Sequence, residues 1–100
     1  MKIVWTEHAI DRVTEIAEYI ALDNPITAEK WVNKLFDEAD KINNFIKRFR
    51  KVKESSNPNH KEIIFGNYRI IFKITPKTYY ILTVRSFKQI LPESDLQNKL

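Results

Sequence analysis

Two kinds of hydrophobic pattern divide the sequence. Apolar residues recur at steps of three and four from Ala9 to Ala21, and again from Ala28 to Ile46, which is the spacing of amphipathic helices. From residue 61 onwards, the apolar residues instead form short runs rich in isoleucine, phenylalanine and tyrosine, which favour strands. The pattern therefore predicts two helices followed by a β-sheet.

The ends of the two helices have recognisable signals. Lys2 to Trp5 alternates in the manner of a short strand, and Thr6 is a residue type that caps a helix. Asn24 and Pro25 then end the first helix and begin the second, because asparagine caps well and proline is tolerated at the first helical position. A link this short predicts an antiparallel helical hairpin.

The chain's only glycine marks a β-hairpin. Gly66 and Asn67 separate two apolar runs, and both residues tolerate the positive φ angles of a two-residue turn. This turn places Phe65 opposite Tyr68 and divides the side chains between two faces. One face is apolar and comprises Ile63, Phe65, Tyr68, Ile70 and Phe72. The other carries Glu62, Ile64, Arg69, Ile71 and Lys73.

The remaining segments complete a small sheet. Residues 49–54 suit a short edge strand, Tyr79 to Arg85 a final strand, and Pro92 to Leu96 a short helix. We therefore expect an α+β fold in the order β-α-α-β-β-β. Its helical hairpin packs on one face of a mainly antiparallel sheet, and the other face is left open or covered by a partner.

Composition narrows the class of protein. At 100 residues, we expect the chain to form a single domain over residues 1–100. Without cysteine it has no disulfide or thiolate metal site, and no apolar stretch is long enough for a signal peptide or a membrane span. One glycine excludes a phosphate-binding glycine loop, and the two histidines are isolated residues expected at the surface. These features predict a cytoplasmic protein with no metal, no cofactor and no membrane partner.

Charge is distributed unevenly along the chain. Residues 1–46 have five Lys or Arg against nine Asp or Glu, whereas residues 47–100 have twelve against four. The basic second half suggests an anionic or acidic partner. The charged residues of interest are Arg50, Glu54, Lys61, Glu62, Arg69, Lys73, Arg85 and Lys88. Arg69 has two interpretations: a solvated sheet face on which Glu54 or Glu62 pairs with it, or a surface that meets something anionic.

These segments together resemble the ParE/RelE superfamily of toxins from type II toxin-antitoxin modules. The likeness covers residues 5–9, the link at residues 20–25, the segment from Arg50 to Glu54, the hairpin at residues 61–74 and the last strand at residues 81–89. The resemblance implies a single toxin domain whose basic sheet face, centred on Arg69, is occupied by a cognate antitoxin. The partner-binding residues it implies are Arg50, Glu62, Arg69, Lys73, Arg85 and Lys88.

The superfamily has two activities. RelE-like members cut mRNA in the ribosome, whereas ParE-like members block DNA gyrase. RNA cleavage needs a base, cations and an acid. Glu54 or Glu62 is the candidate base, and Arg69, Arg85 and Lys61 are the candidate cations.

The acid is missing, because Ser86 and Phe87 stand where RNA-cutting relatives often have histidine or tyrosine. We therefore favour a ParE-like toxin that binds gyrase. The alternatives are a RelE-like ribonuclease acting on the ribosome and mRNA, and a decayed toxin that binds only its antitoxin.

Overall fold

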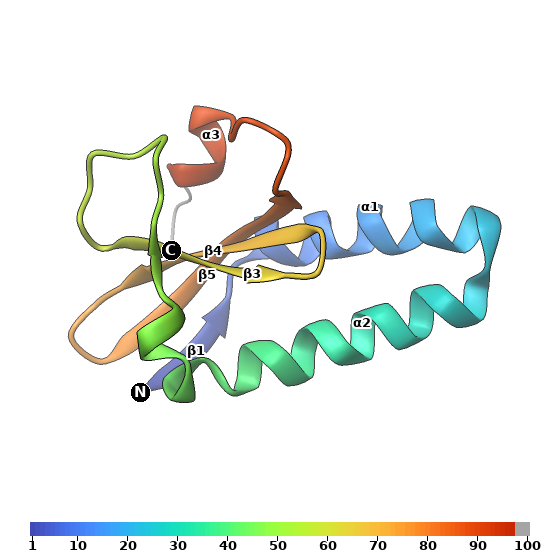
Figure 1. The fold of residues 1–100 in the computed structure, drawn as a ribbon, viewed down its shortest axis with the longest axis horizontal. Helices are drawn as coiled ribbons and strands as arrows, with labels where there is room; N and C mark the ends of the chain where they lie inside the picture. The colour runs from blue at the N-terminus through green and yellow to red at the C-terminus, as the bar shows by residue number, and fades with distance from the viewer. Residues whose placement is uncertain (98–100) are drawn as a thin grey trace.

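The computed structural model describes residues 1–97 and has a pair of long helices on one side of a twisted sheet (Figure 1). The elements in chain order are β1 (Lys2–Trp5), α1 (Glu7–Asp23), α2 (Pro25–Asp40), β2 (Arg50–Lys51), β3 (His60–Phe65), β4 (Tyr68–Ile74), β5 (Thr78–Ser86) and α3 (Glu93–Leu96). Two short 3-10 turns, η1 (Ile42–Asn44) and η2 (Ile46–Arg48), connect α2 to β2.

The five strands form one sheet in the order β1-β5-β4-β3-β2. β1 pairs with β5 in parallel, and all the other neighbours are antiparallel. The predicted α+β fold, with a helical hairpin on a mainly antiparallel sheet, is confirmed. β2 is the predicted edge strand and has only two residues.

Both predicted helix starts are confirmed. Thr6 accepts a hydrogen bond at Oγ1 from the backbone N–H of Ala9, and Asn24 accepts at Oδ1 from the N–H groups of Ile26 and Thr27. The second helix ends at Asp40, earlier than its apolar spacing indicated. Ile42 and Phe45 still reach the core, but from 3-10 turns, which use a tighter spacing of three residues per turn.

The hairpin register is the one that the sequence predicts. Phe65 lies opposite Tyr68, and the face with Ile63, Ile70 and Phe72 packs into the core beneath the helices. Gly66 has φ +57°, but no non-glycine residue of the described chain has a positive φ. A single positive φ angle at the first central position is typical of a type II′ turn. The turn therefore needs glycine at Gly66, but it does not use the ability of asparagine to adopt a positive φ at Asn67.

The second face of the sheet is covered by the chain itself. The segment from Phe87 to Leu96, here called the C-terminal strap, crosses this face and includes α3 (Figure 1). Leu91 of the strap is buried with Val52 and Ile71 in a small second core, against which Leu96 packs. The prediction of a face left open or covered by a partner is therefore wrong for this part of the sheet.

A β-bulge directs the side chains of β5 to the strap. β4 residues Ile71 and Phe72 pair with Thr83 and Ile81, so that β5 has one more residue, Leu82, between these two register pairs. The extra residue shifts the alternation of the strand. Ile81 therefore lies on the helix side, whereas Thr83 and the later Arg85 lie on the strap side, where both contact Asp95.

Candidate functional site

Arg69 of β4 lies at the centre of a buried ion-pair cluster. Its Nη1 and Nη2 donate to Oε2 and Oε1 of Glu54, each at 2.8 Å, and its Nε donates to Oε2 of Glu62 at 2.7 Å. The Arg69 side chain is only 3% exposed. Of the two interpretations that the sequence left open, the structure shows the internal pairing. Both glutamates bind Arg69, and the Glu54 side chain stays 12% exposed.

The C-terminal strap closes this cluster from above. Nη1 of Arg69 donates to the backbone carbonyl of Gln89 at 3.3 Å, and the N–H of Leu91 donates to Oε2 of Glu54 at 2.9 Å. The hydrogen bonds from Arg69 lower the pKa of Glu54 from 4.5 to about 2, against the opposing effect of burial. The same contacts, led by Glu54, raise the pKa of Arg69. The Arg69–Glu54 pair is therefore ionised near neutral pH.

A second cluster fixes α3 to the sheet. Asp95 is completely buried and accepts hydrogen bonds from Arg85 at 2.6 and 3.0 Å and from Thr83 at 3.0 Å, and its Oδ1 lies 2.8 Å from Nε2 of His8. Burial raises the pKa of Asp95, but the hydrogen bonds from Arg85, His8 and Thr83 outweigh it, so the net pKa is lowered. The pair also raises the pKa of Arg85.

The remaining predicted residues do not join these clusters. Arg50 and Lys88 are exposed, and Lys73 is half-buried. Lys61 alternates with Glu62 along β3, so it points to the opposite face from Arg69.

The histidine prediction is wrong for His60, which is buried. Its Nδ1 lies 2.6 Å from Oγ of Ser55. Burial, helped by the charge of Lys73, lowers the pKa of His60.

The arrangement has consequences for the proposed ribonuclease chemistry. A general base must be free to take a proton near neutral pH, and Glu54 has both oxygens bound to Arg69 and a pKa of about 2. Arg85 is engaged by Asp95, and Lys61 is on the other side of the sheet. Of the four predicted catalytic residues, Glu54 and Arg69 are therefore bound to each other, whereas Arg85 is bound to Asp95 and Lys61 points away.

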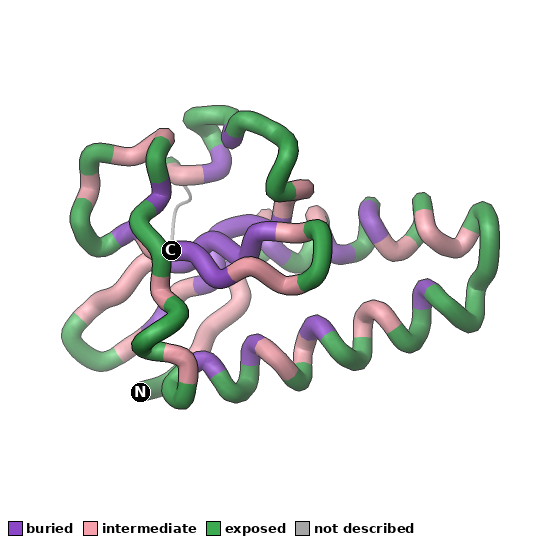
Figure 2. Tube along the Cα trace, viewed as in Figure 1, coloured by how far each residue is buried: buried purple, intermediate pink, exposed green. Residues whose placement is uncertain are grey.

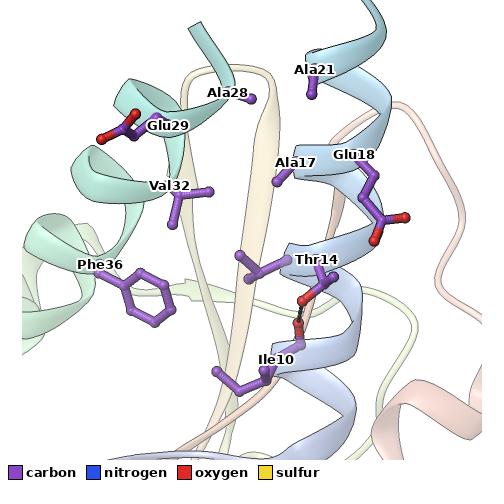
Figure 3. Close-up of a pocket in the computed structure, with 10 residues that line it drawn as sticks. Ile10, Thr14, Ala17, Glu18, Ala21, Ala28, Glu29, Val32 and Phe36 are labelled. Atoms are coloured by element: carbon purple, nitrogen blue, oxygen red, sulfur yellow. Dashed lines mark hydrogen bonds between the residues drawn. The ribbon is translucent and has the colours of Figure 1, made fainter. Parts of the chain in front are cut away.

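The structure adds a feature that the sequence analysis missed: an apolar groove of about 430 Å³ between α1 and α2 (Figure 3). Its walls come from facing positions on the two helices. They include Ile10, Ala17, Ala21, Ala28, Val32 and Phe36. Alanines at three of these positions leave the space between the helices unfilled, while Glu18 and Glu29 stand at its rim with their carboxylates turned outward (Figure 3). The spacing of the alanines is the signal for this groove in the sequence, but alanines at the same spacing also fit a core-facing stripe.

Further apolar side chains lie near the tip of the helical hairpin, which extends beyond the sheet and is largely exposed (Figure 2). Tyr19, Leu22 and Ile26 are 74%, 86% and 65% exposed. Together with the groove, they give the helical hairpin an exposed apolar surface. Exposed apolar surface of this kind marks sites of protein association.

Neither a metal-binding cluster nor a membrane-spanning helix is present within residues 1–97. No group of three or more acidic or histidine side chains is arranged to hold a metal ion there. Over the same residues, no helix has the length and hydrophobicity needed to cross a bilayer.

Comparison with solved structures identifies a protein of the same fold. A chain described as "Chromosomal ParDE TA system from P. aeruginosa" superposes with a TM-score of 0.69 and 19% sequence identity, covering 86% of this chain and 95% of that chain. At this identity the likeness establishes the fold alone. A comparison with curated protein sequences gives no match.

A family model identifies the chain more closely. Residues 3–91 match the model for the ParE toxin of the type II toxin-antitoxin system parDE. The match runs from β1 through the strap residue Leu91 and so covers the helical hairpin, the sheet and the Arg69 cluster. The chain belongs to the ParE toxin family.

Proposed function

We propose that this ParE-type toxin inhibits growth by binding DNA gyrase, and that a cognate antitoxin neutralises it. The match to the ParE family supports gyrase as the target, because ParE-like members of the superfamily block DNA gyrase. The observation that carries the choice of binding over RNA cleavage is the Glu54–Arg69 pair. It occupies both oxygens of the candidate base and holds its pKa at about 2.

The antitoxin is proposed to occupy the groove between α1 and α2. An amphipathic helix has an apolar stripe that fits a groove lined by Ala17, Ala21 and Val32, and helix-in-groove packing is a common mode of peptide recognition. Basic residues flanking that stripe would meet Glu18 and Glu29. The solved ParDE structure supports the expectation of an antitoxin partner, because it is described as a toxin-antitoxin system.

The residues predicted for partner binding take different roles in this proposal. Arg50, Lys73 and Lys88 are accessible at least in part and remain candidates for direct contact with gyrase or the antitoxin. Glu62 and Arg69 are buried, and the Arg85 guanidinium is bound to Asp95. These three residues are proposed not to contact a partner directly. They hold the strap in place, and the strap forms part of the surface that a partner meets.

The cellular test is controlled induction of the toxin in a bacterium while DNA damage and translation are followed. The proposal predicts filamentous cells and a DNA-damage response, with protein synthesis initially intact. An immediate halt in translation with cut messages would instead identify a ribosome-dependent ribonuclease.

Unimpaired growth at confirmed soluble expression would identify a chain that no longer poisons its host. Co-expression of the cognate antitoxin serves as the control and is expected to restore growth. If damage persists while the antitoxin is bound, neutralisation by binding is wrong.

A further inference from the structure

The segment from Lys47 to Lys53, here called the basic edge, has five cations in seven residues and no acid. It runs from η2 into β2, the outermost strand of the sheet. Its cationic side chains are all exposed, and they are Lys47, Arg48, Arg50, Lys51 and Lys53. The strap, the groove and the two ion-pair clusters make no use of these charges.

The apolar residues of the basic edge turn inward. The Phe49 ring packs edge-on against Phe72 at 4.7 Å between centroids, and Val52 is completely buried. The exposed side chains of the basic edge itself are therefore all cationic. Protein partners are usually held by aromatic and aliphatic anchors at the centre of an interface, whereas surfaces that bind nucleic acid are more polar and far more positive.

The cations of the basic edge are not neutralised within the described chain. None of the five takes part in an ion pair among residues 1–97. The nearest acids, Glu54 in sequence and Glu62 across the strand from Arg50, both bind Arg69. The surface therefore keeps its positive charge.

One pair of these charges is unfavourable in the free protein. Lys51 lies directly opposite Lys61 in the β2–β3 register, and like charges at directly opposed positions destabilise a sheet. Arg48, by contrast, is held in place. Its Nη2 donates to the carbonyl of Ile64 at 3.3 Å, and its guanidinium lies 4.7 Å from the Phe45 ring centroid. A bound anion would relieve the repulsion and meet a guanidinium already in position.

Protection of an edge strand explains only part of this pattern. Lysines on an edge strand discourage pairing with other chains. That role accounts for Lys51, but Lys47 and Arg48 precede the strand, in or beside a 3-10 turn, where no edge needs protection.

We propose that the basic edge binds the phosphate backbone of double-stranded DNA without reading its bases. The charges point to phosphates, and the choice of duplex DNA over RNA rests on the proposed function, because DNA is the substrate of gyrase. Seven residues span at most about 23 Å, and a duplex offers one negative charge per about 1.7 Å of its axis. Several phosphates therefore lie within reach.

The test is the fluorescence anisotropy of a labelled duplex titrated with the purified toxin over a range of salt concentrations. If the basic edge contacts about four phosphates, affinity is expected to fall about 100-fold between about 50 and 200 mM salt. Two duplexes of unrelated sequence should bind equally well, because phosphate contacts carry no sequence information.

Charge removal locates the binding surface. Lys51→Gln and Lys53→Gln should each weaken binding and reduce the slope of log affinity against log salt by about one. The double variant Arg50→Gln with Lys51→Gln should reduce it by about two. Lys30→Gln with Lys34→Gln is the matched control, since both lysines are exposed on α2, and its affinity should equal that of the wild type.

Thermal unfolding of each variant separates lost binding from lost structure. Lys51→Gln is expected to unfold at the wild-type temperature or slightly above it, because it removes the repulsion from Lys61. If the double variant fails to fold, the single variants decide the question.

Three results would overturn the proposal. They are the absence of duplex binding at low salt, an equal loss of affinity in the α2 control, and tighter binding of polyglutamate or single-stranded RNA than of duplex DNA. The titration contains no gyrase. If the toxin does not bind duplex DNA, the proposal of gyrase inhibition is unaffected. If the toxin does not inhibit gyrase, the measured DNA binding is unaffected.

Discussion

Arg69 and Glu54 form a two-pronged ion pair in which Nη1 and Nη2 of the guanidinium each lie 2.8 Å from a different oxygen of the carboxylate. The pair joins the middle of the hairpin to the segment that follows β2, and the strap closes over it through Gln89 and Leu91. A cation that the sequence suggests for a partner is thus used to hold the toxin's own sheet, loop and C-terminal strap together.

Removal of this cation is expected to destabilise the fold. Arg69→Ala leaves Glu54 and Glu62 in a buried site without their counterion and should lower the free energy of unfolding by about 3–5 kcal/mol in urea titrations. Arg50→Ala removes the same kind of side chain from an exposed position and should change stability by no more than about 0.5 kcal/mol. Equal stability of the two variants would contradict the structural role of Arg69.

Acid is expected to weaken the same cluster. The pKa of Glu54 is lowered in the folded state from 4.5 to about 2, so its contribution is complete above pH 4.5 and is lost as pH falls through 2. In unfolding experiments from pH 7 to pH 2, wild type should lose stability more steeply than Glu54→Gln. The difference between the two proteins should narrow as Glu54 is protonated. A constant difference over this range would show that Glu54 has an ordinary pKa.

The strap should loosen when its buried carboxylate loses its charge. Asp95→Asn keeps the size of the side chain but weakens the contacts with Arg85 and His8. Hydrogen exchange at the backbone N–H groups of the strap should become faster than in wild type, while exchange in the hairpin changes less. Glu93→Gln makes the same change of charge at an exposed position of α3 and should leave exchange in the strap unchanged. Unchanged exchange in Asp95→Asn would show that Asp95 does not hold the strap on the sheet.

The groove between α1 and α2 offers a direct test of the proposed antitoxin site. Ala21→Phe places a ring in the groove and should weaken antitoxin binding at least about tenfold in calorimetry, because the helix and the ring compete for one space. Ala17→Leu is a smaller change that tests the same wall if the larger one disturbs packing. Lys34→Phe adds a ring on an exposed part of α2 outside the groove lining and is the control. Normal affinity in both groove variants would place the antitoxin elsewhere.

Local signals in the sequence were enough to predict much of the fold. The caps at Thr6 and Asn24 act within a few residues, and the glycine turn at Gly66 fixes the register that buries Phe72. Alternation along paired strands then placed Arg69 on the correct face of the sheet. These features depend on short stretches of chain, which is why pattern alone revealed them.

The environment of Arg69 depends on distant segments and could not be predicted in the same way. Its burial requires Glu54 and the strap to reach it in space. The strap is in turn held through Asp95 by Thr83 and Arg85, which a bulge at Leu82 places on the strap side. A bulge adds one residue without changing the hydrophobic character of a strand, so alternation does not reveal it. The strap contributes two apolar residues to the second core, Leu91 and Leu96, which are too few to form a periodic pattern.

The most direct test of the central claim is supercoiling of relaxed plasmid by purified DNA gyrase in the presence of the folded toxin. The account predicts that supercoiling falls as toxin is added, and that it recovers when antitoxin is supplied in equal amount. Full supercoiling at a large excess of soluble, folded toxin would contradict the account.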